Sequence, residues 1–366
     1  MKPDTRCLGL FMDKLNGERL SWLTEIFFDD LTPRAFFYLT GQALYSSSNF
    51  SKNASVILDH YERNLMGLVR SADPVGTDKL EFFNDLLRKA KDYGEEQKFG
   101  FLQLRSAYMS RTSVYTTRIL SSAFNNDFIP ELYLYLDGLH MMHQNQKPSE
   151  FENILQSIEN IAADIDGKFG EHNFMACSRC ATARGYVDSV DSTGKFISTT
   201  ASDAVKIVNL KKIVEAFTST QPIFSPNSIN IFNASPNQGM DRTIQLTVFI
   251  THDPYSTEYP FGGLSFAVAC ANQGIKTNVV LIEDGVFCAI DGQDVNPDDK
   301  VFSMADIITS TQDDANIEYS VYQPSAFKRN LHEGPKTLDL IQIGVEDLRK
   351  KIKTMQDTPI HRILLF

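Results

Sequence analysis

The motif with the clearest chemistry is a pair of cysteines three residues apart, in Cys177-Ser-Arg-Cys180-Ala-Thr-Ala-Arg184-Gly185. A short apolar stretch, 173–176, runs directly into Cys177 and predicts a strand. We expect a helix to begin there, with Cys177 at or before its first turn, where free backbone N–H groups and the helix dipole favour the thiolate over the thiol. Arg179 and Arg184 add positive charge nearby. The motif therefore predicts a thiolate nucleophile, the species that attacks sulfur.

The elements that must position this motif recur later in the chain. An apolar run, a helical stretch and a second apolar run occupy 99–105, 114–124 and 132–136, and they end in Asp137-Gly138. The same order returns at 244–250, 263–271 and 278–282, and it ends in Asp284-Gly285. Further on, Arg184-Gly185 corresponds to Arg329-Asn330, so the landmarks recur at a spacing of about 145 to 147 residues. This regularity predicts an internal duplication.

A third, weaker copy opens the chain. It has an apolar run at 7–12, a helix-like stretch at 18–28 and a strand-like stretch at 35–39. After these, 55–60 is a candidate strand and 79–92 has the pattern of an amphipathic helix. The Pro- and Asn-rich segment 224–241 reads as a linker, and 92–98 as the other boundary. We therefore expect three domains, at 1–95, 96–232 and 233–366.

Short apolar strands that alternate with helical patterns predict an α/β fold, with parallel sheets flanked by helices on both faces. In such sheets functional groups gather at the carboxyl ends of the strands. Asp137 and Cys177 both follow strands directly, so we expect them to lie at the same edge.

At this point the sequence resembles the DsrE/DsrF-like family of sulfur-relay proteins, which includes the Tus-type sulfur carriers. The resemblance rests on Asp137-Gly138 after the second strand and on the spacing from Cys177 to Arg184-Gly185 after the third. It implies tandem DsrE-like parallel sheets, and a persulfide carried on Cys177. It also implies that the protein works with sulfur-donor and sulfur-acceptor proteins.

The resemblance implies a simple exchange mechanism. The Cys177 thiolate would take sulfur from a donor persulfide, polysulfide or thiosulfonate and yield it to an acceptor thiolate. Arg184 would stabilise the anionic persulfide, and Asp137 would position a basic group or the acceptor. Cys180, about one helical turn on, would resolve the persulfide as a disulfide or share the sulfur.

The copies differ where the chemistry is expected. Tyr322 and Ser325 stand at the places of Cys177 and Cys180, so we expect no sulfur chemistry in the last domain, and the first has no evident cysteine at that point. Because members of the family assemble as trimers, hexamers or related heteromers, three fused copies resemble a trimer in one chain. Such a chain acts either as a pseudo-trimeric monomer or as a homodimer.

Three other interpretations stay open. A binding or scaffold protein could keep the fold without the chemistry, and it would tolerate a buried, unreactive thiol. The Cys177/Cys180 pair could instead be a redox dithiol. His140 and His143 could complete a zinc site with the two cysteines, although histidines at this spacing are more often partly buried surface residues. We expect neither a metal nor a cofactor.

Composition narrows the class of protein. The formal charge is −11, which argues against general binding to nucleic acid or to anionic membranes. The apolar run at 7–12 is too short for a secretory signal, and no stretch is long enough to span a membrane, so we expect a cytoplasmic protein. Five cysteines make a disulfide framework improbable, and Cys7, Cys270 and Cys288 read as packing residues. Phosphate-loop and nucleophile-elbow motifs are absent from the sequence.

Overall fold

The structure of the chain is a computed structural model, and it describes most of the chain from residue 98 onward together with four short stretches before it. The described residues are 6–12, 16–27, 34–39, 68–70, 98–109, 112–219, 223–225, 227–233, 244–296, 298, 302–332, 334, 336–356 and 360–366.

The chain forms two compact units. Unit 1 comprises Met1–Leu8, Leu15–Pro33 and Asn237–Phe366, and unit 2 comprises Gly9–Lys14 and Arg34–Pro236. The division into three domains stays a prediction, because residues 40–67 and 71–97 lie outside the described residues, including the candidate strand at 55–60 and most of the candidate helix at 79–92.

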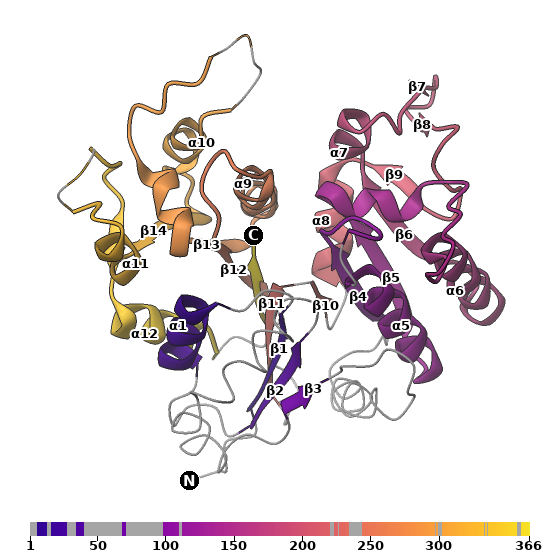
Figure 1. Cartoon of the computed structure of the whole chain (residues 1–366), viewed down its shortest axis with the longest axis horizontal. Helices are drawn as coiled ribbons and strands as arrows, with labels where there is room; N and C mark the ends of the chain where they lie inside the picture. Colours follow the sequence, from indigo (N-terminus) through magenta and orange to yellow (C-terminus); the bar gives the residue numbers. More distant parts are fainter. Residues whose placement is uncertain are drawn as a thin grey trace. The chain divides into compact units, whose positions relative to one another are not determined.

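Unit 2 contains a five-stranded parallel sheet in the order β10-β4-β5-β6-β9. Its strands are β4 (Lys98–Gln103), β5 (Ile129–Leu134), β6 (Asn173–Cys177), β9 (Lys206–Val208) and β10 (Ile223–Phe224). The helices between them are α5 (Thr112–Asn125), the 3-10 helix η3 (Leu136–Met142), α6 (Ile154–Phe169), α7 (Ser178–Ala183) and α8 (Leu210–Ser219). In Figure 1 these strands lie between α5 and α6 on one side and α8 on the other.

Unit 1 contains five parallel strands in the same relative order, β16-β12-β13-β14-β15. They are β12 (Ile244–Ile250), β13 (Lys276–Leu281), β14 (Ile317–Tyr322), β15 (Ile341–Ile343) and β16 (Ile360–Leu365). The helices are α1 (Gly17–Phe27), α9 (Tyr259–Ala271), the 3-10 helix η4 (Glu283–Ala289), α10 (Met304–Thr311), α11 (Gln323–Lys328) and α12 (Val345–Gln356). The fifth strand in chain order pairs with the first in both units.

Four further strands are described besides these ten and the short hairpin of β7 (Ser189–Val190) and β8 (Phe196–Ile197). They are β1 (Arg6–Met12), β2 (Arg34–Leu39), β3 (Leu68–Arg70) and β11 (Asn227–Asn233). The linker predicted over 224–241 is therefore wrong in part, because 227–233 forms a strand. The sequence Ser-Ile-Asn-Ile-Phe places Ile229 and Ile231 two residues apart and adds an aromatic residue, and this β-favouring pattern outweighs the flanking Pro and Asn residues.

The central strands read as continuous apolar runs because both faces of a parallel sheet are covered. All but the first residue of β4, β5 and β13 are buried. Two tight turns then lead from strand to 3-10 helix. A Cβ at Gly138 would lie 2.1 Å from the carbonyl oxygen of Gln103, and one at Gly285 would lie 1.9 Å from that of Ile250. Only glycine fits at either place, which explains the Asp-Gly pairs that end the second strands.

Candidate functional site

The predicted site residues of unit 2 gather at the carboxyl ends of β5 and β6. Cys177 is the last residue of β6 and the N-cap of α7, with extended backbone geometry, as the motif predicts. Asp137 lies in η3 directly after β5, and Arg184 is the C-cap of α7. Arg184 donates to Asp137 Oδ1 from Nη2 at 2.7 Å and from Nε at 2.9 Å. The structure therefore brings Asp137 and Arg184 into direct contact beside the two cysteines.

The two sulfur atoms have opposite acid–base character. A hydrogen bond from the Cys180 side chain lowers the pKa of Cys177 to about 7; burial opposes this shift, and the N–H groups of Cys180 and Arg179 add to it. The same hydrogen bond raises the pKa of Cys180 well above its usual range, and burial raises it further. At neutral pH the pair can therefore hold one negative charge on Cys177 and one proton on Cys180.

Both thiols are buried. Cys177 is 1% exposed and Cys180 is 8% exposed, so a reagent in solvent reaches neither sulfur without local movement. The scaffold interpretation tolerates this burial. The carrier interpretation requires an accessible thiolate, and the structure shows a lowered pKa of Cys177 but a buried sulfur.

The two histidines of the motif Leu139-His-Met-Met-His143 lie against Tyr186. His140 Nδ1 is hydrogen-bonded to the Tyr186 hydroxyl at 2.8 Å, and the His143 ring lies edge-on to the Tyr186 ring at 5.9 Å. Burial lowers the pKa of His140, which favours the neutral imidazole. Among the described residues no group of three or more His, Cys, Asp or Glu side chains is placed to hold a metal ion. The zinc alternative with Cys177 and Cys180 is therefore not assembled.

The same contacts recur in unit 1 without the cysteines. Arg329 donates to Asp284 Oδ1 at 2.7 and 2.8 Å, as Arg184 does to Asp137. Both arginines are C-caps with φ −103° and ψ 10°. Tyr322 takes the N-cap place of Cys177, and Ser325 takes the place of Cys180. The two units thus share one site geometry, with a thiol pair in one and hydroxyls in the other.

A second repeated contact supports the 3-10 helices. The Tyr108 hydroxyl donates to Gln146 Oε1 at 2.7 Å, and the Tyr255 hydroxyl donates to Gln293 Oε1 at 2.5 Å. Each glutamine donates in turn to two carbonyl groups of its 3-10 helix. Sequence reasoning missed these four residues, although both pairs are 147 residues apart and the repeat spacing points to them.

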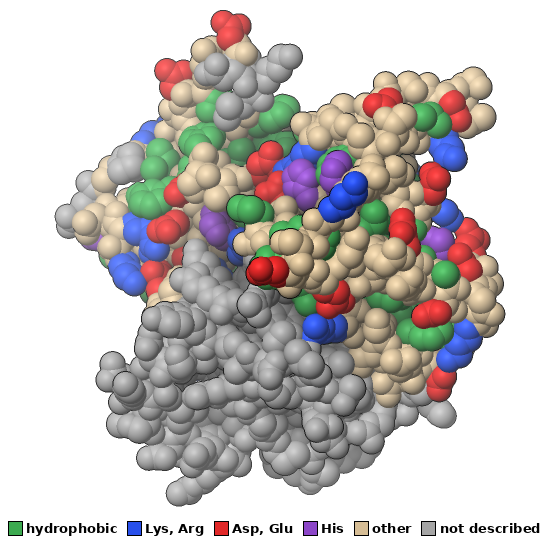
Figure 2. Space-filling view, turned by 45° about the vertical axis from the view of Figure 1, so that its right-hand side comes forward, with side chains coloured by type: hydrophobic (Ala, Val, Ile, Leu, Met, Phe, Trp, Pro, Cys, Tyr) green, Lys and Arg blue, Asp and Glu red, His purple; other side chains and the backbone are tan. Residues whose placement is uncertain are grey.

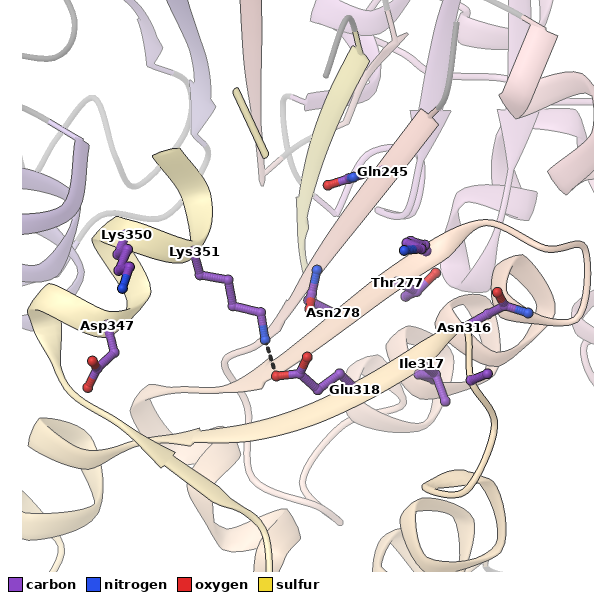
Figure 3. A pocket seen from close by; sticks show the side chains of 11 residues that line it. Gln245, Thr277, Asn278, Asn316, Ile317, Glu318, Asp347, Lys350 and Lys351 are labelled. Atoms are coloured by element: carbon purple, nitrogen blue, oxygen red, sulfur yellow. Dashed lines mark hydrogen bonds and ion pairs between the residues drawn. The ribbon is translucent and has the colours of Figure 1, made fainter. Parts of the chain in front are cut away.

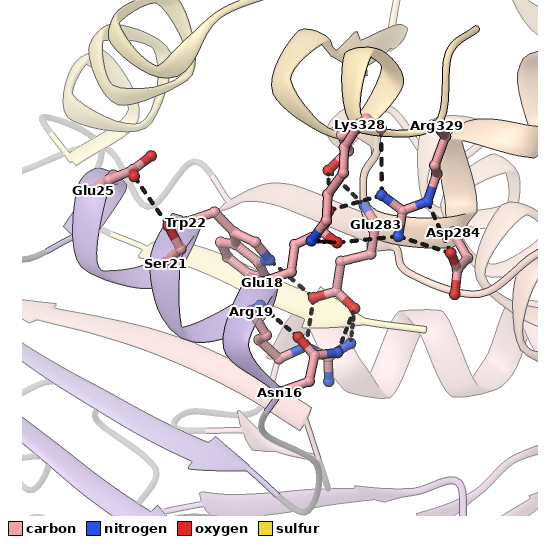
Figure 4. Close-up of polar contacts among 11 residues, drawn as sticks. Asn16, Glu18, Arg19, Ser21, Trp22, Glu25, Glu283, Asp284, Lys328 and Arg329 are labelled. Atoms are coloured by element: carbon pink, nitrogen blue, oxygen red, sulfur yellow. Dashed lines mark hydrogen bonds and ion pairs between the residues drawn. The ribbon is translucent and has the colours of Figure 1, made fainter. Parts of the chain in front are cut away.

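Helix α1 packs on the site of unit 1 (Figure 4). Asn16 caps the helix by accepting from the N–H of Arg19 at 2.7 Å. Glu18 then accepts hydrogen bonds from Ser325 Oγ at 2.8 Å, from Arg329 Nη1 at 2.9 Å and from Lys328 Nζ at 2.9 Å. Burial raises the pKa of Glu18, but these three donors outweigh it and lower the pKa to about 2.

The next turn of α1 reaches a buried carboxylate. Arg19 Nε donates to Glu283 Oε1 at 2.8 Å and its Nη2 to Oε2 at 3.0 Å, with both side chains at most 5% exposed. The Trp22 indole N–H donates to the same Oε1 at 2.9 Å. Both oxygens of the Glu283 carboxylate therefore accept hydrogen bonds from α1, so the site of unit 1 is built around this helix. Nothing in the local sequence pairs 16–22 with 283–329, and the prediction missed this contact.

The remaining cysteines behave as packing residues, as predicted, where the structure describes them. Cys270 and Cys288 are fully buried, and burial raises the pKa of each thiol above its usual range. The side chain of Cys7 lies outside the described residues.

A polar depression of about 460 Å³ opens at the other end of the sheet in unit 1 (Figure 3). It lies at the amino ends of β12, β13 and β14 and is lined by residues such as Lys276, Asn278, Glu318 and Lys351. An ion pair joins Lys351 to Glu318 across it. Because it is at the opposite strand ends from Asp284 and Arg329, it is not part of the repeated site.

Charged side chains of both signs lie on the surface of the described residues (Figure 2). On the face in Figure 2 the acidic and basic side chains of the described residues are interspersed. No helix among the described residues is both long and apolar enough to cross a membrane.

Fold and site together define an α/β class of domain, with a parallel sheet and a functional edge at the carboxyl ends of its strands. Residues 245–358 match the model of the DsrE/DsrF-like family. One similar solved structure is the ychN protein from E. coli, with 20% sequence identity and a TM-score of 0.29 over 35% of this chain and 98% of that chain. A search of the curated proteins found no match.

Proposed function

We propose that the chain is a sulfur carrier that passes sulfane sulfur through a persulfide on Cys177. The observation that carries the proposal is the position of Cys177 at the carboxyl end of β6 and at the N-cap of α7, beside the hydrogen-bonded pair of Asp137 and Arg184. The lowered pKa of Cys177 supports it. The family match supports a sulfur-relay role at a coarse level. The matched residues include Tyr322 and Ser325, which stand in the places of the two cysteines. We therefore assign the sulfur chemistry to unit 2, where Cys177 and Cys180 are present.

The transfer is a pair of thiol exchanges. The Cys177 thiolate attacks the outer sulfur of a donor persulfide, R–S–SH; the S–S bond of the donor breaks, and R–S⁻ leaves with the electron pair. Cys177–S–SH is then attacked at its outer sulfur by an acceptor thiolate, which regenerates the Cys177 thiolate and yields the acceptor persulfide. No external oxidant or reductant is needed, because each step moves one sulfane sulfur between thiols.

The neighbouring residues have defined roles in this proposal. Arg184 supplies positive charge at the edge where the persulfide anion forms, and Asp137 fixes the guanidinium through its two hydrogen bonds. Donor and acceptor are proteins that deliver and collect the sulfur, and the chain acts in the cytoplasm, as a pseudo-trimeric monomer or a homodimer.

Intact-protein mass spectrometry tests the proposal. The protein is incubated with polysulfide, and wild type is compared with Cys177→Ser. A mass gain of one or more sulfur atoms that disappears in Cys177→Ser and is removed by a thiol reductant supports the carrier. A matched control, Cys288→Ala, removes a buried thiol of unit 1 and leaves the sulfur gain unchanged.

A second candidate function is a non-catalytic binding or scaffold protein. The burial of Cys177 and Cys180, at 1% and 8% exposure, favours it. Under this alternative the wild type gains no sulfur, and Cys177 resists iodoacetamide in the native protein across pH 6 to 9.

A further inference from the structure

The chain that follows the site helix is longer in unit 2 than in unit 1. In unit 2 the N–H of Gln144 donates to the carbonyl of Thr200 at 2.7 Å, and in unit 1 the N–H of Asp291 donates to that of Lys336 at 2.9 Å. The two contacts are equivalent, because Gln144 and Asp291 lie 147 residues apart, as the two glutamines below the 3-10 helices do. The chain takes 16 residues from position 184 to position 200, but only 7 from position 329 to position 336. Unit 2 therefore carries an insertion of nine residues after α7.

The insertion contains the hairpin of β7 and β8, which pair antiparallel. Asp191 closes its turn by accepting from the N–H groups of Thr193 and Lys195 at 2.8 and 2.9 Å. The hairpin stands out from the rest of unit 2 (Figure 1), and its apolar side chains Val190 and Ile197 are 54% and 37% exposed. It therefore has a defined fold but adds little to the core of the unit.

A groove of about 650 Å³ is lined by this hairpin and by β9. All three residues of β9, Lys206, Ile207 and Val208, line it. Because successive side chains of a strand point to opposite faces, a groove that touches all three runs along the backbone edge of the strand. β9 is the last strand in the order of its sheet, so no described strand pairs with this edge. Ile207, Val208 and Phe196 of β8 are half-buried, and they make part of the lining apolar.

The charged side chains of the groove are mostly basic, although the whole chain is acidic. Lys195, Lys206 and Lys212 line it, and Asp203 is the one acidic residue among the lining residues. Lys206 also pairs with Glu171 at 2.5 Å, but both side chains are about half exposed or more, so water weakens this ion pair. The groove thus favours a chain that carries carboxylates.

The groove lies beside the strand that ends in the thiol. β9 pairs with β6, and Val208 stands opposite Cys177 in the register. Neighbouring strands of a sheet are about 4.8 Å apart. A chain bound along the open edge of β9 would therefore run two strand positions from Cys177.

We infer that this groove docks an extended, acidic segment of the protein that exchanges sulfur with Cys177. The segment pairs with the open edge of β9, as peptides do when they add a strand to a sheet. Its carboxylates meet Lys195 and Lys212, and its apolar side chains contact Phe196 and Val208. The inference rests on the proposed function for the identity of the partner, and it deepens that function. The same insertion is missing from unit 1, which also lacks the cysteine pair.

Binding of a model peptide tests the groove without any sulfur chemistry. The probe is a fluorescein-labelled octapeptide of alternating valine and glutamate, and its matched control alternates valine and lysine. Fluorescence anisotropy should show binding of the acidic peptide and at least about tenfold weaker binding of the basic one. Lys195→Glu and Lys212→Glu should each weaken binding of the acidic peptide by roughly three- to tenfold.

Lys211→Glu is the matched control for Lys212→Glu. Lys211 is the preceding residue of α8, is equally exposed, and does not line the groove. The same charge change there should weaken binding by less than about twofold. Bound peptide should also slow amide hydrogen exchange in β9. Absence of binding, equal affinities for the two peptides, equal effects of the two lysine variants, or β9 exchange that the peptide leaves unchanged would each overturn the inference.

Sulfur uptake by Cys177, measured on the same protein by mass spectrometry, separates this inference from the proposed function. Sulfur uptake without peptide binding leaves the carrier function standing and defeats the docking groove. Peptide binding with the expected lysine dependence but without sulfur uptake supports the groove and defeats the carrier function.

Discussion

Glu18 and Ser325 are separated by 307 residues in the chain and lie 2.8 Å apart in the structure. The contact joins the first turn of α1 to α11, so the C-terminal sheet and the N-terminal helix form one polar cluster (Figure 4). The cluster occupies the edge of unit 1 that corresponds to the thiol edge of unit 2. In unit 1 this edge holds the carboxylate of Glu18, so substitutions in the cluster should change the stability of the unit.

The first prediction concerns acid. The pKa of Glu18 is lowered to about 2 in the folded protein against about 4.5 when unfolded, so Glu18 contributes stability above pH 4.5 that is lost as pH falls toward 2. With 16% of its side chain exposed, the contribution is roughly 2 to 3 kcal/mol. Glu18→Gln should remove this stabilisation at neutral pH and make the free energy of unfolding depend less on pH below 4.5. Trp22 is the only tryptophan in the sequence, so the urea midpoint of its fluorescence measures the change locally.

Glu25→Gln is the matched control for Glu18→Gln. Glu25 is an exposed residue on the same helix, and its side chain accepts from Ser21 Oγ. This variant should change the free energy of unfolding, measured by Trp22 fluorescence against urea, by less than about 0.5 kcal/mol. Equal shifts for the two variants would show that α1 responds to charge in general and not to the Glu18 contacts.

The second prediction separates another acid-sensitive group from Glu18. His361 on β16 is fully buried; burial lowers its pKa to about 3, and its Nε2 lies 2.9 Å from Thr247 Oγ1. Its folded pKa is below its unfolded value of about 6.5, so stability is complete above pH 6.5 and falls between pH 6.5 and 3. His361→Gln should flatten stability in that window, whereas Glu18→Gln acts only below about pH 4.5. Urea midpoints of wild type and both variants, measured from pH 3 to 7, distinguish the two groups. If wild type loses no more stability than His361→Gln between pH 6.5 and 4.5, the assignment to His361 is wrong.

The third prediction is a double-mutant cycle on the buried ion pair. Leu136 stands in unit 2 where unit 1 has Glu283, so the fold accepts an apolar residue there. Glu283→Leu alone leaves the Arg19 guanidinium buried and without its carboxylate, and we expect a loss of about 3 to 5 kcal/mol. Adding Arg19→Leu should recover most of it, because two apolar side chains then replace the pair.

Trp22 fluorescence against urea reads each corner of this cycle. The Trp22 indole N–H also donates to Glu283, so this hydrogen bond is lost in Glu283→Leu and in the double variant alike. Its loss therefore cancels when the stabilities of these two variants are compared. A double variant no more stable than Glu283→Leu would show that the pair is not coupled.

The sequence predicts the frame of each sheet well. The apolar run at 244–250 matches β12 residue for residue, and the strand at 173–176 matches β6 except for its last residue, because buried parallel strands are short apolar runs with clear ends. The sequence also predicts that Asp137 and Cys177 lie at one sheet edge, since each follows a parallel strand; it does not predict the ion pair of Asp137 with Arg184. By contrast, η3 and η4 carry no periodic signal, and only the steric demand at Gly138 and Gly285 shows why the chain turns there.

The sequence does not reveal what holds α1. Glu18, Arg19 and Trp22 look like one face of an ordinary amphipathic helix, and their partners lie more than 260 residues away. Such contacts depend on tertiary placement that local patterns do not encode. The acid–base asymmetry of Cys177 and Cys180 is equally hidden, since it depends on the interaction of the two side chains and on their burial in the folded protein.

The last prediction tests the turn that places Asp137 beside the thiols. A Cβ at Gly138 would lie 2.1 Å from the carbonyl oxygen of Gln103, a backbone atom that cannot move aside easily. Gly138→Ala should therefore cost more than about 3 kcal/mol and displace Asp137 from Arg184. Gly167→Ala, at an exposed place in α6 with nothing within 4 Å of the new Cβ, should instead stabilise unit 2 by about 0.5 to 1 kcal/mol. Amide hydrogen exchange of β5 and β6 reads both variants. Unchanged protection in Gly138→Ala would mean that the close approach of this glycine to β4 is not required for the site edge to form.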